Sequence, residues 1–374
     1  MSAPATRGAA SAPALHVNNF DLIRLAAALQ VAYIHCAWHF RTLESDRPLS
    51  SFMALFPGVP IFFFTSGFLI SKSFERNSNL REYAWNRVLR IYPALIVCFV
   101  LSLTATWLCG FFAGQEVPHG QFSAWVLAQL TLGQFYNPPF ISRPPIWALN
   151  GSAWTITVEL QFYVLVPLLY LWLGLARLPR RRSNLILGGL IAVFLLLRQV
   201  WPGTDPGFGG ALGPQIPAAL FVPWFYMFLV GVLFQRNSAW LKSLLAGRFV
   251  YVFIAYCALA VFAARHWQWS LKDAPHPVLF AGLALVTFAA AFSAPTLAQR
   301  LLRRNDVSYG LYIYNAPVIN VLLLTGILAG RVAEGVALGA SLALGYASWV
   351  FIEKPALAFK RNPLYSHRTA GSGE

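Results

Sequence analysis

The chain has 374 residues, of which 57% are hydrophobic and only 11% are charged, and its mean hydropathy is +0.57. Soluble globular domains carry about 25% charged residues, so this composition excludes them, as well as disordered and fibrous chains. It indicates an all-α, polytopic membrane protein. The net charge of +15 is then explained by membrane topology and by contacts with anionic membrane lipids, without any nucleic-acid partner.

Ten apolar segments approach the roughly 20 residues that a helix needs to cross a bilayer. They are residues 20–40, 53–73, 91–112, 154–175, 184–201, 216–235, 249–265, 277–294, 307–329 and 334–353. A shorter apolar segment, 122–135, is predicted to form a re-entrant or interfacial helix within a long loop.

The predicted organisation is one transmembrane domain, residues 18–361, between two tails, residues 1–17 and 362–374. The N-terminal tail has one arginine and no apolar run long enough for a signal peptide. Both tails are expected to be disordered. If the N-terminus lies inside, most of the 28 lysines and arginines fall on inner connections, including the run 180–182. Because inner loops carry an excess of these residues, we predict ten helices with both termini in the cytoplasm.

The first apolar segment contains Arg24 and His35, eleven residues apart. Three helical turns span about 10.8 residues, so both side chains lie on nearly one face, about 16 Å apart along the axis. Ionisable residues at such depth usually face the interior of a bundle. The structural alternatives are a salt bridge from Arg24 to Asp21 and a neutral, hydrogen-bonded core histidine at position 35. His39 has metal-ligand spacing to His35, but no third ligand is evident, so no metal site is predicted.

The fourth apolar segment begins near Trp154 and carries a carboxylate, Glu159. Counting helix rise from the outer surface places Glu159 at about the depth of His35. A neighbouring carboxylate orients an imidazole and raises its basicity, so we expect the two residues to form a pair in which His35 acts as a general base. The alternative is a purely structural His–Glu pair.

Two further stretches contain polar residues. Ser66 and Gly67 in the second segment favour close helix packing over nucleophilic catalysis, because no base is evident beside the serine. Arg87 and Arg90 lie on one face at the inner surface, where paired arginines suit bidentate phosphate binding. Their structural alternative is anchoring under the positive-inside rule.

Taken in chain order, six stretches of the sequence resemble the integral membrane acyltransferase family 3. This family contains the bacterial O-antigen, exopolysaccharide and peptidoglycan O-acetylases. The matching stretches are NNFDLIRLAAALQVAYIH at 18–35, FPGVPIFFFTSGFLISKSF at 56–74, RVLRIYPAL at 87–95, WTITVELQFYVLVPLL at 154–169, VSYGLYIYNAPV at 307–318 and FIEKP at 351–355. The chain departs from the family at Asn315, where a histidine is common.

The resemblance implies that Arg24, His35 and Glu159 are catalytic and that Arg87 and Arg90 hold the phosphates of an acyl-CoA donor, most simply acetyl-CoA. The implied acceptor is a hydroxyl of a lipopolysaccharide, exopolysaccharide or other lipid-linked or exported glycan, and the implied location is the bacterial inner membrane. Trp147 and Trp154 are expected to stack against the sugar. A transporter or flippase for lipid-linked saccharides is the alternative, although no inverted repeat is detectable.

Overall fold

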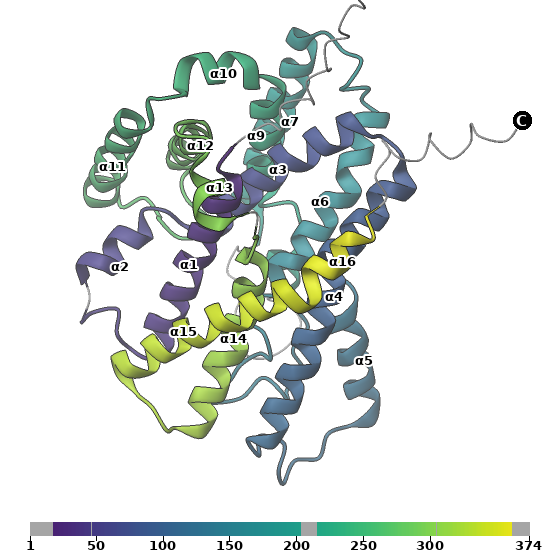
Figure 1. The fold of residues 1–374 in the computed structure, drawn as a ribbon, viewed down its shortest axis with the longest axis vertical. Coiled ribbons are helices and arrows are strands. Elements are labelled where there is room, and N and C mark those ends of the chain that lie inside the picture. The colour runs from purple at the N-terminus through teal and green to yellow at the C-terminus, as the bar shows by residue number, and fades with distance from the viewer. Residues whose placement is uncertain (1–17, 46, 203–214, 304, 361–374) are drawn as a thin grey trace, which may run out of the picture.

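The computed structural model describes residues 18–45, 47–202, 215–303 and 305–360, and these residues form a helical bundle (Figure 1). No strand occurs among them; their one isolated β-bridge joins Arg143 and Ile146. The all-α prediction is therefore confirmed for this part of the chain. The two predicted tails lie outside the described residues.

Each of the ten predicted apolar segments overlaps one main helix, although the helix of the predicted segment 91–112 begins eleven residues earlier, at Leu80. These helices are α1 (Phe20–His39), α3 (Gly58–Arg76), α4 (Leu80–Leu108), α6 (Trp154–Leu171), α7 (Arg180–Val200), α9 (Phe225–Arg236), α11 (Phe249–His266), α12 (Pro277–Phe292), α14 (Ser308–Thr325) and α15 (Gly330–Ser348). Shorter elements connect or extend them: α2 (Arg47–Ala54), α5 (His119–Leu130), α8 (Gln215–Ala219), α10 (Ser238–Leu245), α13 (Leu297–Leu302), a π-helix (Trp349–Glu353) and α16 (Lys354–Ala358).

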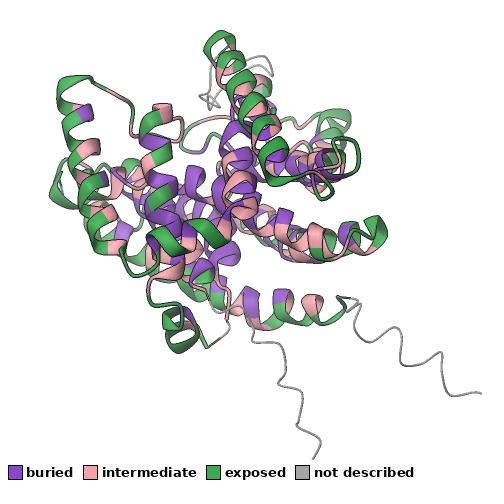
Figure 2. Ribbon diagram, turned by 90° about the horizontal axis from the view of Figure 1, so that it is seen from above, coloured by how far each residue is buried: buried purple, intermediate pink, exposed green. Residues whose placement is uncertain are grey.

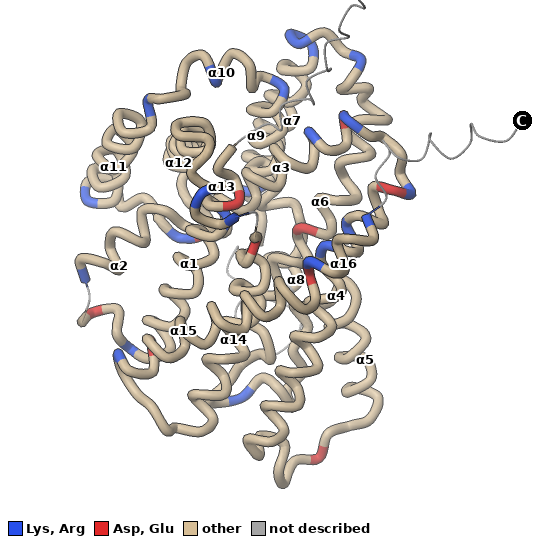
Figure 3. Tube along the Cα trace, viewed as in Figure 1, with Lys and Arg blue, Asp and Glu red and all other residues tan. Residues whose placement is uncertain are grey.

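Seven helical segments in the described residues are long and apolar enough to cross a membrane. They are Phe20–His39, Arg47–Arg76, Leu80–Leu108, Trp154–Leu171, Arg180–Val200, Phe249–His266 and Gly330–Ala358. Helices α9 and α12 are apolar but shorter, with 12 and 16 residues. The protein is therefore a multi-pass helical membrane protein, while the count of ten crossings and the N-in, C-in orientation stay predictions. Figure 3 shows most lysines and arginines in the upper half of the bundle.

Buried residues gather at the centre of the bundle, and exposed residues predominate on the peripheral helices (Figure 2). Only 11% of the apolar window of α7 and 17% of that of α11 is buried. Leu185, Leu196 and Ile254 on these helices are among the exposed side chains. A helix that is apolar on all sides yet unburied by protein is typical of contact with lipid.

Small residues bring α3 and α9 into direct backbone contact. A Cβ atom added at Gly67 would lie 2.0 Å from the carbonyl oxygen of Phe228, and one added at Gly231 would lie 2.2 Å from that of Phe64. No side chain fits in either gap, so the predicted close packing at the Ser66–Gly67 step is confirmed. This contact fixes the position of α3, which carries one wall of the candidate site.

Candidate active site

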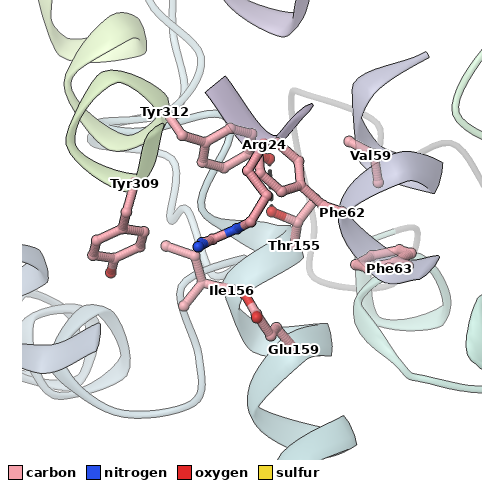
Figure 4. Close-up of a pocket in the computed structure, with 9 residues that line it drawn as sticks. All are labelled: Arg24, Val59, Phe62, Phe63, Thr155, Ile156, Glu159, Tyr309 and Tyr312. Carbon is pink, nitrogen blue, oxygen red and sulfur yellow. Dashed lines mark hydrogen bonds between the residues drawn. The ribbon is translucent and has the colours of Figure 1, made fainter. Parts of the chain in front are cut away.

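A small cavity of about 30 Å³ lies among α1, α3, α6 and α14 (Figure 4). We call it the Arg24 cavity; it is lined by Arg24, Val59, Phe62, Phe63, Thr155, Ile156, Glu159, Tyr309 and Tyr312. Figure 4 shows the Arg24 guanidinium extending between Tyr309 and Ile156, on the side of the cavity where Glu159 lies. The structure thus brings two of the predicted catalytic residues, Arg24 and Glu159, to one cavity.

Arg24 is ion-paired, but not with the residue expected from its own helix. Its Nη1 atom lies 2.8 Å from Oδ2 of Asp306, in the connection before α14, whereas Asp21 had been the structural alternative. Arg90 donates to the same Asp306 oxygen through Nη2. Its Nη1 atom lies 3.7 Å from Oε2 of Glu353. Asp306 therefore joins α1 to α4, a link that no local sequence spacing predicts.

The two arginines of the predicted phosphate clamp have different surroundings. Arg90 is only 13% exposed and both of its Nη atoms face carboxylates. Arg87 lies with its guanidinium carbon 5.5 Å from the ring centroids of Tyr83 and of Tyr163, and its Nη2 atom is 3.5 Å from Oγ of Ser73. The structure therefore does not place the two residues as a free pair, because the charge of Arg90 is already compensated.

Asp306 is held in its ionised form. Burial alone would raise the pKa of its carboxyl, but the guanidiniums of Arg24 and Arg90 and two hydrogen bonds from Ser308 outweigh burial and hold the pKa well below its usual value. Because the folded-state pKa is depressed, the stabilisation is fully present above the unfolded pKa near 4 and is lost only as the pH falls through the lower folded value. The Asp306 carboxylate is therefore ionised throughout the physiological range.

Glu159 does not pair with His35, which corrects the prediction from helix rise. Its Oε1 atom accepts hydrogen bonds from Ser66 Oγ at 2.9 Å and from Tyr163 OH at 2.7 Å. The error lies in the starting height of α6, because Ser152, just before this helix, already contacts His35. Glu159 is seven residues further along, about 10 Å in helix rise, and so lies on the Arg24 side.

A second, larger cavity of about 470 Å³ contains His35. We call it the His35 cavity; it is lined by Ile34, His35, Trp38, His39, Trp147, Ala148, Gly151, Ala316, Ile319 and Asn320. The Nδ1 atom of His35 lies 3.4 Å from Oγ of Ser152. Trp147 is 36% exposed on the cavity wall, whereas Trp154 is buried against Trp224 with ring centroids 5.2 Å apart. Of the two tryptophans expected to stack on a sugar, only Trp147 is therefore available in this cavity.

A hydrogen-bonded partition lies between the two cavities. The Tyr312 hydroxyl is 2.6 Å from Oγ1 of Thr155 and donates to the backbone carbonyl of Ser152 at 3.2 Å. Tyr312 and Thr155 line the Arg24 cavity, and the side chain of Ser152 contacts His35. The predicted site residues thus form two groups with this partition between them.

The sequence analysis did not predict several residues of this site. Some of them have a recognisable sequence pattern and others have none. Tyr163 lies four residues after Glu159 in the same helix, a spacing at which side chains meet. Ser66 was assigned to packing alone, and Ser152 and Asp306 lie in connections that carry no periodic signal. Asn315, the departure from the family pattern, is buried and donates to Cys36 Sγ and Ser341 Oγ.

The structure defines a multi-pass membrane protein whose buried polar residues surround two cavities, as an enzyme acting within a bilayer requires. Comparison with known proteins identifies the class. A family model described as an acyltransferase domain matches residues 17–352, so the chain belongs to this integral membrane acyltransferase family.

Three relatives agree with that assignment. The nodulation protein 10 of Rhizobium leguminosarum bv. viciae is 31% identical, over 92% of this chain and 94% of its own. The O-acetyl transferase of Shigella phage Sf6 is 24% identical over 91% and 96%. The peptidoglycan O-acetyltransferase OatA of Listeria monocytogenes is 24% identical over 71% of this chain and 45% of its own. No solved structure matches this chain significantly. The protein is therefore a membrane acyltransferase acting on hydroxyl groups.

Proposed function

We propose that this protein transfers an acyl group, most simply acetyl, from a cytoplasmic acyl-CoA to a hydroxyl of an exported or lipid-linked glycan in the bacterial inner membrane. The observation that carries this proposal is the imidazole of His35 on the wall of a cavity large enough for a sugar. Trp147 offers an aromatic face in the same cavity. The names of relatives such as the O-acetyl transferase and OatA support acetyl as the transferred group.

In the proposed reaction, His35 takes the proton of the sugar hydroxyl, and the hydroxyl oxygen attacks the carbonyl carbon of the thioester. The carbon–sulfur bond breaks, the acyl group stays on the sugar, and the proton leaves with the thiolate as free CoA thiol. Ser152 is proposed to orient the imidazole through Nδ1, the role that Glu159 was expected to fill. Arg24 is proposed to orient the acyl donor from the Arg24 cavity.

Arg87 is the proposed contact for the phosphates of CoA. Arg90 was expected to share this role, but its pairing with Asp306 and Glu353 supports a role in holding the site together. Arg87 has no carboxylate partner among the ion pairs of the described residues. Glu159 is proposed to orient groups in the Arg24 cavity through Ser66 and Tyr163.

The test is release of free thiol from acetyl-CoA by purified protein, with and without a glycan acceptor. His35→Ala is expected to lower acceptor-dependent release by about 10²–10⁴-fold, the usual contribution of a general base. His266→Ala, at the exposed end of α11, is the matched control and is expected to keep full activity. Acceptor-dependent release that persists in a well-folded His35→Ala variant would refute the assignment. A wild-type protein that moves saccharide without releasing thiol would be a transporter instead.

A further inference from the structure

A buried chain of charges lies beside the Arg24 cavity and has no part in the proposed chemistry so far. Its order is Arg24, Asp306, Arg90 and Glu353, in which each residue is ion-paired with the next. Asp306 and Arg90 are each 13% exposed, and Glu353 is 2% exposed. Each arginine of the chain is therefore paired with at least one carboxyl group inside the bundle.

Asp306 is the central member of this chain of charges, because both oxygens of its carboxylate accept hydrogen bonds. Oδ2 accepts from both arginines, and Oδ1 accepts from Oγ of Ser308 at 2.5 Å and from its backbone N–H at 3.3 Å. The bonds from Ser308 fix the carboxylate to the first turn of α14. Because Oδ1 is held by Ser308, the carboxylate presents Oδ2 toward Arg24 and Arg90.

The far end of the chain is equally fixed. Glu353 ends the π-helix and accepts from Ser348 Oγ at 3.1 Å through Oε1. Its Oε2 atom has no hydrogen-bond donor and faces Arg90 at 3.7 Å. Arg90 is therefore held between two carboxylates that belong to different elements, and it cannot follow Arg24 if that side chain moves.

Arg24 needs such support, because an arginine side chain has many rotamers. Among the hydrogen bonds and ion pairs of the described residues, Asp306 binds only Nη1 of Arg24, which leaves other N–H groups of the guanidinium for a ligand. Arg24 also lines the Arg24 cavity, and Figure 4 shows its guanidinium beside Ile156. The ion pair thus fixes one end of a planar group whose other N–H groups can bind a ligand.

Stability alone is a poor explanation for this arrangement. A buried ion pair often contributes little more than well-packed apolar residues, because the desolvation of both charges offsets their attraction. The protein has a comparable ion pair, Glu75 with Arg236 at 2.7 Å, that lies away from both cavities. The two pairs differ in that only Asp306 binds an arginine that lines a cavity.

We propose that Asp306 is a positioning residue that sets the guanidinium of Arg24 for its contact with the acyl donor, with Arg90 and Glu353 holding Asp306 in turn. This inference rests on the proposed function, in which Arg24 orients the donor. It predicts an effect on kcat that is larger than the effect on KM for the donor, because a donor bound in the wrong orientation reacts slowly.

The experiment compares Asp306→Asn, Asp306→Glu and wild type in acceptor-dependent thiol release, with kcat and KM for acetyl-CoA determined separately. Asp306→Asn is expected to lower kcat by about 10²-fold, as a misplacement of about 1 Å in a catalytic group does. KM for acetyl-CoA should change much less. Asp306→Glu keeps the negative charge on a side chain that is one methylene longer, and its kcat should lie between those of Asp306→Asn and the wild type. Adding Asp306→Asn to an Arg24→Gln variant should cause little further loss, because Arg24 is the group that Asp306 positions.

Glu75→Gln is the matched control, since it breaks an ion pair of similar length and exposure elsewhere. Its kcat per folded molecule should equal that of the wild type, with folded protein quantified by size-exclusion chromatography. The proposal is overturned if folded Asp306→Asn keeps wild-type kcat, if Glu75→Gln loses kcat equally, or if the losses of Arg24→Gln and Asp306→Asn multiply. Absence of thiol release by the wild type would instead refute the proposed function, so the two failures are distinguishable.

Discussion

The hydrogen bond between Tyr163 and Glu159 provides a quantitative test of the site geometry. Tyr163→Phe removes the hydroxyl that donates to Glu159 Oε1 at 2.7 Å and keeps the buried ring. Hydrogen bonds to charged groups contribute about 1.5–3 kcal/mol in water-soluble proteins. Bonds between groups in membrane helices average about 0.6 kcal/mol and reach about 1.7. Since Glu159 keeps its bond from Ser66, we expect a loss near the top of the membrane range, about 1.5 kcal/mol.

The measurement is a double-mutant cycle. The free energy of unfolding is determined in mixed micelles for the wild type, for Tyr163→Phe, for Glu159→Leu and for the double variant. The interaction free energy should be about 1–1.5 kcal/mol, because the phenol and the carboxylate are in direct contact. Tyr309→Phe is the matched control. Its hydroxyl lies at the same cavity but donates to the carbonyl of Ile91 at 3.1 Å, so its coupling to Glu159→Leu should be close to zero. Equal coupling for both tyrosines, or none for Tyr163, would refute the geometry of Glu159.

Three further outcomes are expected. Ser152→Ala should lower kcat by about 2–10-fold without changing KM for acetyl-CoA, because one neutral hydrogen bond to His35 is lost; an unchanged rate would exclude Ser152 as the group that orients the imidazole. Gly67→Ala should destabilise the protein by about 1–3 kcal/mol or more in unfolding measurements, because the added Cβ would clash with the backbone of α9. Gly188→Ala is the control: a Cβ atom added at Gly188 would meet no atom within 4 Å, so this variant should be as stable as the wild type or more stable. Because the depressed pKa keeps Asp306 ionised above pH 5, its ion pair with Arg24 should contribute equally at pH 5 and pH 6.5. The check is the free-energy difference between Asp306 and Asp306→Asn in a Glu353→Gln background, which removes the neighbouring carboxyl, and a change between the two pH values would contradict this.

The helices themselves could be predicted from the sequence, because a bilayer demands long apolar segments whose backbone groups are satisfied locally. Each of the ten predicted segments overlaps a helix, and the Ser66–Gly67 step marks a close helix contact as expected. The same constraint makes ionisable residues within these segments rare, which is why Arg24, His35 and Glu159 could be singled out without any structure.

The grouping of these residues was decided by tertiary structure alone. Helix rise gives a height only if the starting level of the helix is known, and the loop before α6 enters the bundle and brings Ser152 to His35. Glu159 consequently lies beside Ser66 and Tyr163, and it lines the Arg24 cavity. The partner of Arg24 is Asp306, which is 282 positions away in the sequence. Periodicity describes one helix at a time, whereas an ion pair between distant segments depends on how the whole bundle packs.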